Sequence, residues 1–474
     1  MQRSILKAPG STNPSQQQVQ HVMQLYTEDN LPQAVVQVDR LLRSFPNSTF
    51  LHNILGATHV GLGQFDAAIE SYNNALKINP NDAKTHFNIG IAFGHKGDLG
   101  SAIRSYKQAI NIDPNYAIAF NNMGNALKDK GDLVQAIDSY KQAIKIEPDF
   151  AEVYDNLGNA QKDSGDLELA LGSYKQALQI NPDYAEAYNN MGSALQDKGD
   201  LEQARNSYEQ ALRIKPDYTA AAWNMVGTTK HICDAEVWVE RCLATDQNDL
   251  NAKIQFCVLK FFGGDRKVFN DMMQSSLKDH PTMRSLEWIS KLPSLPKLHF
   301  NRWAFFDSII ELSRQDRPFY EFGVFRGGAF KYLINTFKKG FGFDTFEGLP
   351  ADWHEEKAGS YSSRGNIPKI AGGEFIVGKF EDTLPVFFAQ PRPMASVINF
   401  DADLYSSTIC ALNNSKLIID CHTILIFDEF IINEHWEQDE YKALIEFCAA
   451  NDYTFEVLAV SFFTKQVAIK LVSI

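Results

Sequence analysis

The first half of the chain repeats itself every 34 residues, and this period limits its fold more than any other feature of the sequence. Five glycines have this spacing: Gly56, Gly90, Gly124, Gly158 and Gly192. Alanines, tyrosines and prolines follow it too, at Ala68, Ala102, Ala136, Ala170 and Ala204, at Tyr72, Tyr106, Tyr140, Tyr174 and Tyr208, and at Pro80, Pro114, Pro148, Pro182 and Pro216. Five in-phase units therefore cover residues 49–218. Such a period predicts an array of small units, each packed against its neighbours.

Each unit contains the residues that a pair of packed helices needs. Glycine and alanine let two helices come into contact, tyrosine is large enough to fill the gap between units, and proline ends the second helix. This period and pattern resemble those of tetratricopeptide (TPR) repeats. The first half is therefore predicted to be an all-α TPR superhelix whose groove binds a protein or peptide partner.

The repeat region extends beyond its five regular units. Residues 15–48 keep the alanine and the proline of the pattern, at Ala34 and Pro46, and resemble an end-capping repeat. The register is lost after the fifth unit, and residues 219–283 are expected to form irregular helical pairs. We assign 15–283 to the superhelix, 284–474 to a second domain and 1–14 to a disordered lead-in.

Asparagine recurs on the predicted first helix of successive units, at Asn88, Asn122, Asn156 and Asn190. In TPR proteins this helix lines the concave groove. One interpretation is a ladder of side chains that grips the backbone of an extended peptide. The other, which we favour, is that the asparagines only solvate the groove.

The second half alternates predicted strands with predicted helices. Residues 317–337 suggest a strand, a glycine turn and an amphipathic helix. Further strands are expected at 340–346, 374–378, 395–401, 422–428, 454–460 and 465–472, and helices at 406–419 and 437–450. This alternation predicts an α/β fold with a mostly parallel sheet, covered on both faces, and a site at the carboxyl ends of its strands.

The glycine turn after the first of these strands and the acids near it indicate which nucleotide-type cofactor could bind. Its glycines, Gly323, Gly327 and Gly328, do not have the GxGxxG spacing of dinucleotide folds, which disfavours NAD. Glu321 ends the first strand, and Asp344 ends the second strand 23 residues later. An acid at that distance commonly binds the two hydroxyls of a ribose. Alternatively, Asp344 only caps the turn that follows it.

Acidic side chains gather at two further strand ends. Asp401 and Asp403 follow one apolar strand, and Asp428 and Glu429 follow the next. Crowded carboxylates repel one another unless a positive charge lies between them. Oxygen ligands at neighbouring strand ends suit Mg²⁺, and the absence of histidine and cysteine among them argues against zinc. The alternative is that these acids only cap the strand ends.

Six sequence blocks of the second half resemble one enzyme family in content and in order. They are EFGVFRGG, FDTFEGLP, GKFEDTLP, DADLYSST, FDEF and YKALIEF, and together they span about 317–472. The same blocks occur in the TylF-type macrocin O-methyltransferases. The resemblance implies a Rossmann-like class I methyltransferase fold, S-adenosylmethionine (AdoMet) as cofactor and a Mg²⁺-dependent methyl transfer to a hydroxyl.

The resemblance also assigns roles to residues of this chain. It makes Asp401, Asp428 and Glu429 the metal ligands and Asp403 the general base that takes the substrate proton. The residues implied to bind AdoMet are Glu321, Gly323, Val324, Gly327, Asp344 and Asp401. The family usually has two consecutive aspartates where this chain has Asp428 and Glu429. The loop at 351–372 resembles the variable lid of the family.

Composition excludes several other functions. The net charge of −13 leaves neither half with the basic surface that nucleic-acid binding needs. Apolar runs stay well below 18 residues, so no membrane span is predicted, and no secretory signal is visible. The six cysteines form no CxxC pair, which favours free thiols in a reducing compartment. We predict a cytoplasmic protein.

Three functions remain open on the sequence. The first is an AdoMet- and magnesium-dependent O-methyltransferase that acts on a hydroxyl of a sugar or glycosylated natural product. The second is a methyltransferase whose protein or carrier-bound substrate is held by the TPR groove. The third is a TPR scaffold with a vestigial methyltransferase-like domain. The complete set of motifs favours the first two over the third.

Overall fold

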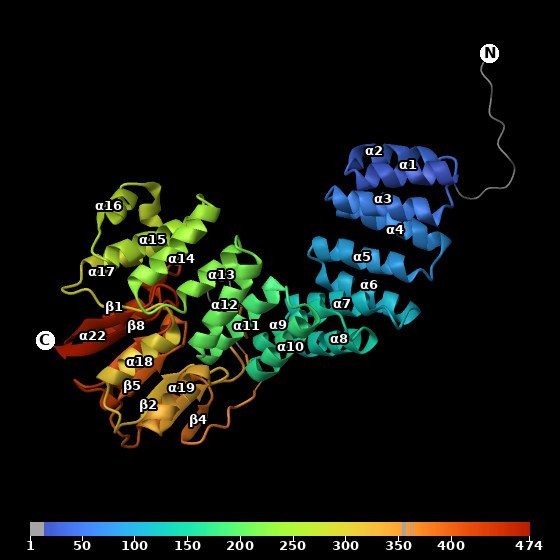
Figure 1. Cartoon of the computed structure of the whole chain (residues 1–474). Helices are drawn as coiled ribbons and strands as arrows, with labels where there is room; N and C mark the ends of the chain where they lie inside the picture. The colour runs from blue at the N-terminus through green and yellow to red at the C-terminus, as the bar shows by residue number, and fades with distance from the viewer. Residues whose placement is uncertain (1–13, 353–356, 361, 364) are drawn as a thin grey trace, which may run out of the picture. The chain divides into compact units, whose positions relative to one another are not determined.

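The computed structural model describes residues 14–352, 357–360, 362–363 and 365–474, and it divides into two compact units after Lys198. The predicted lead-in at 1–14 lies almost wholly outside the described residues. His354 and Arg364, the candidate substrate contacts of the predicted lid, also lie outside them. Each unit is described on its own. Figure 1 gives the order of the helices and strands in each.

The first unit is entirely helical in its described part. Its helices are α1 Gln16–Thr27, α2 Leu31–Leu42, α3 Thr49–Gly61, α4 Phe65–Ile78, α5 Ala83–His95, α6 Leu99–Ile112, α7 Ala117–Asp129, α8 Leu133–Ile146, α9 Ala151–Asp163, α10 Leu167–Ile180 and α11 Ala185–Lys198. Consecutive helices pair within each repeat, and Figure 1 shows the pairs stacked one after another. The period of 34 residues therefore gives the helical array that it predicts.

The repeated glycine and tyrosine are in contact inside each repeat. A Cβ atom added to Gly158 would lie 2.5 Å from Cε1 of Tyr174, and the same distance separates the corresponding atoms in the three preceding repeats. Tyr174 itself is fully buried. The tyrosine thus packs on the glycine of its own unit, and Tyr72 also shares an apolar cluster with Ile89 and Ala92 of the next unit, as a residue that fills the gap between units should. Glycine is required here because any side chain would overlap the ring.

The second unit begins with helices and continues into a sheet. The helices are α12 Leu201–Ile214, α13 Thr219–Val226, α14 Ile232–Thr245, α15 Leu250–Phe262, α16 Lys267–Met273, η1 Ser276–Asp279 and α17 Pro281–Ser290. Residues 219–283 are therefore mostly helical, as expected. They are followed by an α/β region from residue 297 onward.

The described residues of this region form an eight-stranded mixed sheet. Its strands are β1 Lys297–Leu298, β2 Phe319–Phe322, β3 Gly340–Asp344, β4 Gly373–Val377, β5 Val397–Phe400, β6 Ile424–Phe427, β7 Tyr453–Val460 and β8 Val467–Ser473. Their order is β1-β7-β8-β6-β5-β2-β3-β4. Strand β8 is antiparallel to both of its neighbours, and the other pairings are parallel. The order reverses between β2 and β5, which makes their carboxyl ends the expected ligand site.

Helices cover both faces of the sheet. They are α18 Arg302–Leu312, α19 Gly328–Phe337, α20 Phe380–Phe388, α21 Tyr405–Ser415 with η2 Lys416–Ile418, and η3 Trp436–Gln438 with α22 Glu440–Ala450. One apolar core holds Phe306 of α18 and Phe330 of α19 against Phe319 and Val397. The other holds α20, α21 and α22 against the opposite face.

This second core also contains side chains from helices that precede the sheet. Ile254, Val258 and Phe261 of α15 share it with Val460 at the end of β7. The sequence pattern predicts a domain boundary between residues 283 and 284. That position falls inside the second compact unit, because the helices before it bury their apolar faces in the same core as the sheet.

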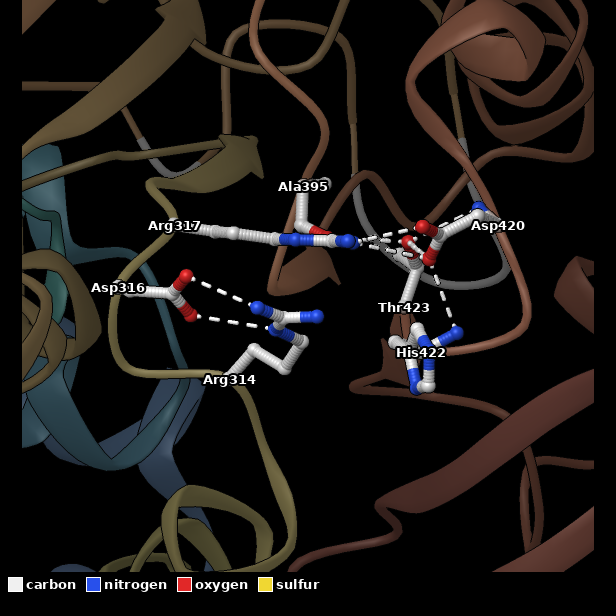
Figure 2. Close-up of polar contacts among 7 residues, drawn as sticks. All are labelled: Arg314, Asp316, Arg317, Ala395, Asp420, His422 and Thr423. Carbon is white, nitrogen blue, oxygen red and sulfur yellow. Dashed lines mark hydrogen bonds and ion pairs between the residues drawn. The ribbon is translucent and has the colours of Figure 1, made fainter.

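An ion pair joins two strands at their amino ends. Arg317, before β2, donates from Nη1 to both carboxylate oxygens of Asp420, before β6, at 2.9 and 2.8 Å. Asp420 also accepts from the backbone N–H of His422 at 2.9 Å, and the Thr423 hydroxyl donates to the carbonyl of Ala395 at 3.0 Å (Figure 2). These contacts connect the amino ends of the central strands, at the end of the sheet opposite the carboxyl ends.

Candidate functional site

A cavity of about 340 Å³ opens at the carboxyl ends of the central strands. Its lining residues come from the loops after β2, β3, β5 and β6, from the start of α18 and from the start of α20. Six of the residues singled out from the sequence lie in this lining: Gly323, Asp344, Asp401, Asp403, Asp428 and Glu429. The parallel strand order thus brings together acids that lie far apart in the chain.

Three other predicted site residues have different positions. Val324 is buried, and its backbone N–H lies in the loop that follows β2. Gly327 is the residue before α19 and has a left-handed conformation with φ of 73°. Glu321 lies within β2 and is 1% exposed. These three residues are not part of the described cavity lining.

Gly323 brings two of the loops together. Its φ of 89° suits glycine, and a Cβ atom at this position would lie only 1.8 Å from the carbonyl oxygen of Asp401. The family resemblance predicts that the glycines let the backbone approach a cofactor. In the structure, the missing side chain of Gly323 leaves room for the loop after β5.

Asp344 connects the loops after β2 and β3. Its Oδ2 accepts hydrogen bonds from the backbone N–H groups of Val324 and Phe325, both at 2.7 Å, and its Oδ1 accepts from Phe346 at 2.6 Å. The last of these is the turn cap that the sequence left open as an alternative. A carboxylate has about four acceptor positions, so these three bonds leave one for a ligand in the cavity.

Two buried polar side chains lie side by side on the neighbouring strands β2 and β5. Glu321 of β2 is in register with Asn399 of β5, and both side chains are buried. Among the described residues, Oε2 of Glu321 and both polar side-chain atoms of Asn399 have no hydrogen-bond partner. Burial raises the pKa of Glu321 well above its usual range, and the charge of Arg302 only partly opposes this shift.

Asp401 and Asp403 follow β5. Burial raises the pKa of Asp401 well above its usual range, and the nearby charge of Asp428 adds to the effect. Burial also raises the pKa of Asp403 to about 7, with further contributions from Glu429 and Asp428. Asp403 has a φ of 57°, a conformation uncommon for residues other than glycine that often marks functional sites.

The acids at the end of β6 are paired with groups of the chain itself. Nη2 of Arg302 lies 2.5 Å from Oδ2 of Asp428, and Nε2 of Gln466 donates to Oδ1 at 2.5 Å. Nζ of Lys465 lies 2.9 Å from Oε2 of Glu429, which also accepts from Nδ2 of Asn433 at 2.9 Å. The positive charges that the crowded carboxylates require are thus arginine and lysine side chains.

The predicted magnesium ligands do not fit a metal ion in this arrangement. Throughout the described part of the chain, no three histidine, cysteine or acidic side chains are placed to hold one. Each oxygen of Asp428 accepts one hydrogen bond, and Oδ2 accepts its bond from the guanidinium of Arg302, whose positive charge would repel a metal ion bound beside it. Magnesium needs open oxygen ligands in a near-octahedral arrangement. The metal set of Asp401, Asp428 and Glu429 therefore disagrees with the geometry.

Arg302, Lys465 and Gln466 were missed by the sequence analysis. Arg302 lies 126 residues before Asp428, at the start of a helix that carries no motif. Gln466 reaches Asp428 because β8 is antiparallel to β6, which pairs Phe427 with Val467. Knowledge of the strand order would have revealed Gln466 as a neighbour of Asp428, whereas no signal in the sequence indicates Arg302.

Two of the four repeated asparagines of the first unit, Asn156 and Asn190, make hydrogen bonds between successive repeats. Nδ2 of Asn156 in α9 donates to Oδ1 of Asn121 in α7 at 3.0 Å. Nδ2 of Asn190 in α11 reaches both oxygens of Asp155 in α9, each at 3.0 Å. Burial raises the pKa of Asp155 to about 6. These asparagines therefore join the first helices of neighbouring repeats, a role that neither sequence interpretation included.

Comparisons with known proteins bear on the repeat region. Models described as TPR repeat match residues 56–97, 95–131, 124–165 and 158–199, and a model described as tetratricopeptide repeat matches 185–218. The comparison with curated proteins gave no match. The part of the chain that the structure describes contains no helix both long and apolar enough to cross a membrane.

Solved structures similar to this chain include other repeat proteins. A crystal structure of MamA is 28% identical, with a TM-score of 0.33, and the match covers 34% of this chain and 95% of that one. The C-terminal part of a TPR repeat-containing protein from Cytophaga hutchinsonii is 18% identical, with a TM-score of 0.41, and the match covers 49% and 97%. YrrB is 18% identical, with a TM-score of 0.34 and coverage of 39% and 95%.

The family-model matches lie within residues 56–218, where the glycine and tyrosine contacts recur. The similarity of the second half to TylF-type methyltransferases stays a prediction from sequence blocks. The N-terminal region of this chain is an all-α array of TPR repeats.

Proposed function

We propose that this protein is an AdoMet-dependent O-methyltransferase whose TPR repeats bind a protein or peptide partner. The observation that carries the proposal is the cavity at the carboxyl ends of β2 and β5, where the strand order reverses. The loop with Gly323, the acid Asp344 and the half-buried acid Asp403 all line this one cavity. They are the residues for which the family resemblance implies cofactor and base roles.

The strand order supports a nucleotide-type fold. Read in chain order from β2, the strands β4-β3-β2-β5-β6 follow the 3-2-1-4-5 order of doubly wound sheets. The antiparallel β8 lies between β6 and β7. A fold of this kind is the one that the resemblance implies for the second half.

The residues present suit the cofactor. The volume of about 340 Å³ falls within the range of small-molecule pockets. Asp344 and the loop after β2 would hold the nucleoside part, since one acceptor position of Asp344 remains after its three backbone bonds. Phe325 adds an apolar ring to the same wall. When bound, AdoMet supplies an electrophilic methyl group on a sulfonium.

Asp403 is the residue that we assign as the general base. It lines the cavity, and its pKa of about 7 suits a group that takes a proton near neutral pH. Its carboxylate would accept the proton of the substrate hydroxyl. Glu321 and Glu440 do not fit this role, because both side chains are buried and neither lines the cavity. No step is assigned to a metal, since the predicted ligands do not fit one.

The repeats support the second part of the proposal. TPR repeats are arrays that present extended surfaces to protein or peptide partners. A methyl acceptor borne by such a partner would be brought to the cavity at a raised local concentration. The acceptor is therefore either a free small molecule, such as a sugar or glycosylated natural product, or a group carried by the partner.

One observation favours a second function. Asp428 and Glu429, which the family resemblance makes metal ligands, are engaged with Arg302 and Lys465. A scaffold that binds AdoMet without turnover would also be compatible with that pairing. The two candidates differ in one measurable property, the conversion of AdoMet.

The test is the formation of S-adenosylhomocysteine by the full-length protein with methyl-labelled AdoMet. Sugars, glycosylated small molecules and peptides are offered as acceptors, and label transfer is measured for each. We expect transfer to a hydroxyl of one class and a loss of at least ~100-fold in Asp403→Asn, in the range of general-base contributions. AdoMet binding without transfer to any acceptor would favour the scaffold, and equal turnover in Asp403→Asn would remove the assigned base.

A further inference from the structure

The site contains an internal cation where the family resemblance implies a metal. Arg302 is the first residue of α18, and its guanidinium lies in the cavity lining beside the carboxylate of Asp428. Asp428 raises the pKa of Arg302, and the charges of Asp401 and Glu321 act in the same direction. Arg302 and the acids that follow β5 and β6 thus line one cavity.

The position of Arg302 is fixed by its neighbours. Oδ1 of Asn301 accepts from the backbone N–H of Ala304 at 2.8 Å and caps the helix, while its Nδ2 donates to the carbonyl of Gly227 at 2.9 Å. On the other side of Arg302, the ring of Trp303 lies 4.6 Å from that of Tyr332. Contacts of Asn301 and Trp303, the residues on either side of Arg302, thus fix the first turn of α18. The side chain of Arg302 is thereby held beside the acids.

The acids Asp428 and Glu429 receive their compensating charge and their hydrogen bonds from side chains of this chain, without a metal. Arg302 and Lys465 bring two positive charges, the charge of one Mg²⁺ ion. The two oxygens of Asp428 accept from Arg302 and Gln466, and Oε2 of Glu429 contacts Lys465 and Asn433. A divalent ion would have to displace these donors and lie beside a guanidinium that repels it.

We infer that the guanidinium of Arg302 takes the place of the divalent cation at this site, so that the methyl transfer proceeds without metal. The inference rests on the proposed function and specifies how the same site works. Arg302 holds Asp428 in place, and its positive charge acidifies an acceptor hydroxyl placed beside it, as a metal ion would. An acceptor hydroxyl is then activated by Arg302 and deprotonated by Asp403.

The experiment is a calorimetric titration of full-length protein with MgCl₂, which needs neither cofactor nor acceptor. For the wild type we expect no saturable binding up to ~10 mM, and no change in thermal midpoint between Mg²⁺ and a chelator. Arg302→Met should acquire Mg²⁺ binding, because the acids then lack their guanidinium. The matched control is Arg317→Met, which removes an arginine–carboxylate pair at the opposite edge of the sheet (Figure 2) and should acquire none.

Two results would overturn the inference. One is wild-type protein that binds Mg²⁺ with a dissociation constant below ~1 mM and loses the binding in Asp428→Asn. The other is a folded Arg302→Met that binds Mg²⁺ no better than Arg317→Met. If Arg302→Met does not fold, the wild-type titration alone decides. Because no AdoMet is present, failure of the proposed function would show separately, as absent cofactor binding or absent turnover.

Discussion

The guanidinium of Arg302 lies 2.5 Å from the carboxylate of Asp428, and this pair joins the start of α18 to the end of β6. Asp428 is buried, with 5% of its surface exposed, and its other oxygen accepts from Gln466. The pair thus belongs both to the wall of the cavity and to the packing of the sheet. Its removal should affect folding as well as chemistry.

We predict that Asp428→Ala destabilises the protein by about 3–5 kcal/mol, because it leaves Arg302 without its buried partner. The double variant Asp428→Leu with Arg302→Met should lose less, since neither charge is then unpaired. Urea denaturation followed by tryptophan fluorescence measures both. A double variant less stable than Asp428→Ala would show that the pair is not the source of the effect.

The contact between Gly158 and Tyr174 gives a second prediction. Gly158→Ala should destabilise the repeats by about 1–3 kcal/mol, because the added methyl overlaps the fully buried ring. Gly172 is a matched control, since it lies in the neighbouring helix α10 with no atom within 4 Å of an added Cβ. Gly172→Ala should stabilise by about 0.5–1 kcal/mol. Thermal unfolding by circular dichroism should rank the two on opposite sides of the wild type.

Asp155 gives a prediction about pH. Burial raises its pKa from 3.8 to about 6, and the charges of Glu152 and Glu186 add to the rise. A raised pKa in the folded state contributes stability below the unfolded pKa, and this contribution is lost as pH rises through 6. Ionisation of Asp155 therefore lowers the free energy of unfolding by about 3 kcal/mol above pH 7, and by roughly half of that at pH 5.

Asp155→Asn should remove this cost, because asparagine occupies the corresponding places in neighbouring repeats, at Asn121 and Asn189. Its amide oxygen can still accept from Asn190, as Asn121 accepts from Asn156. The variant should be more stable than the wild type at pH 8, and its advantage should shrink as the pH falls to 5. Denaturation at both pH values measures this. An advantage that does not change with pH would contradict the raised pKa.

Truncation tests how the second unit is built. A chain of residues 199–474 should unfold cooperatively, whereas residues 284–474 should not, because the latter lose Ile254, Val258 and Phe261 from the core under the sheet. Limited proteolysis and near-ultraviolet circular dichroism distinguish the two. If 284–474 unfolds as cooperatively as the longer fragment, the boundary predicted from the sequence is the better one.

The sequence predicted the parts of the fold that have local or periodic signals. Strands expected at 340–346 and 454–460 are found at Gly340–Asp344 and Tyr453–Val460, because apolar runs between turn residues mark buried strands. Helix α20 was missed, since it contains Pro385 and begins with acidic residues that carry no apolar period. Local patterns thus fixed most element positions to within a few residues.

The candidate site was predicted only in part, for a physical reason. Acids at the ends of parallel strands meet at one edge, so the grouping of Asp344, Asp401, Asp403 and Asp428 follows from topology. The partners of these acids do not. Arg302 contacts Asp428 because α18 begins beside the end of β6, and Lys465 contacts Glu429 from the turn before β8. Such contacts depend on tertiary packing, which one sequence does not show.

The most direct measurement of the central claim is a calorimetric titration of the full-length protein with AdoMet in the presence of a chelator. The cavity should bind one AdoMet, with a dissociation constant between about 1 μM and 1 mM, the range usual for enzyme substrates. S-adenosylhomocysteine should compete, and NAD should not bind, because the glycine spacing differs from the dinucleotide pattern. Absence of saturable AdoMet binding up to ~1 mM, with or without Mg²⁺, would contradict the account.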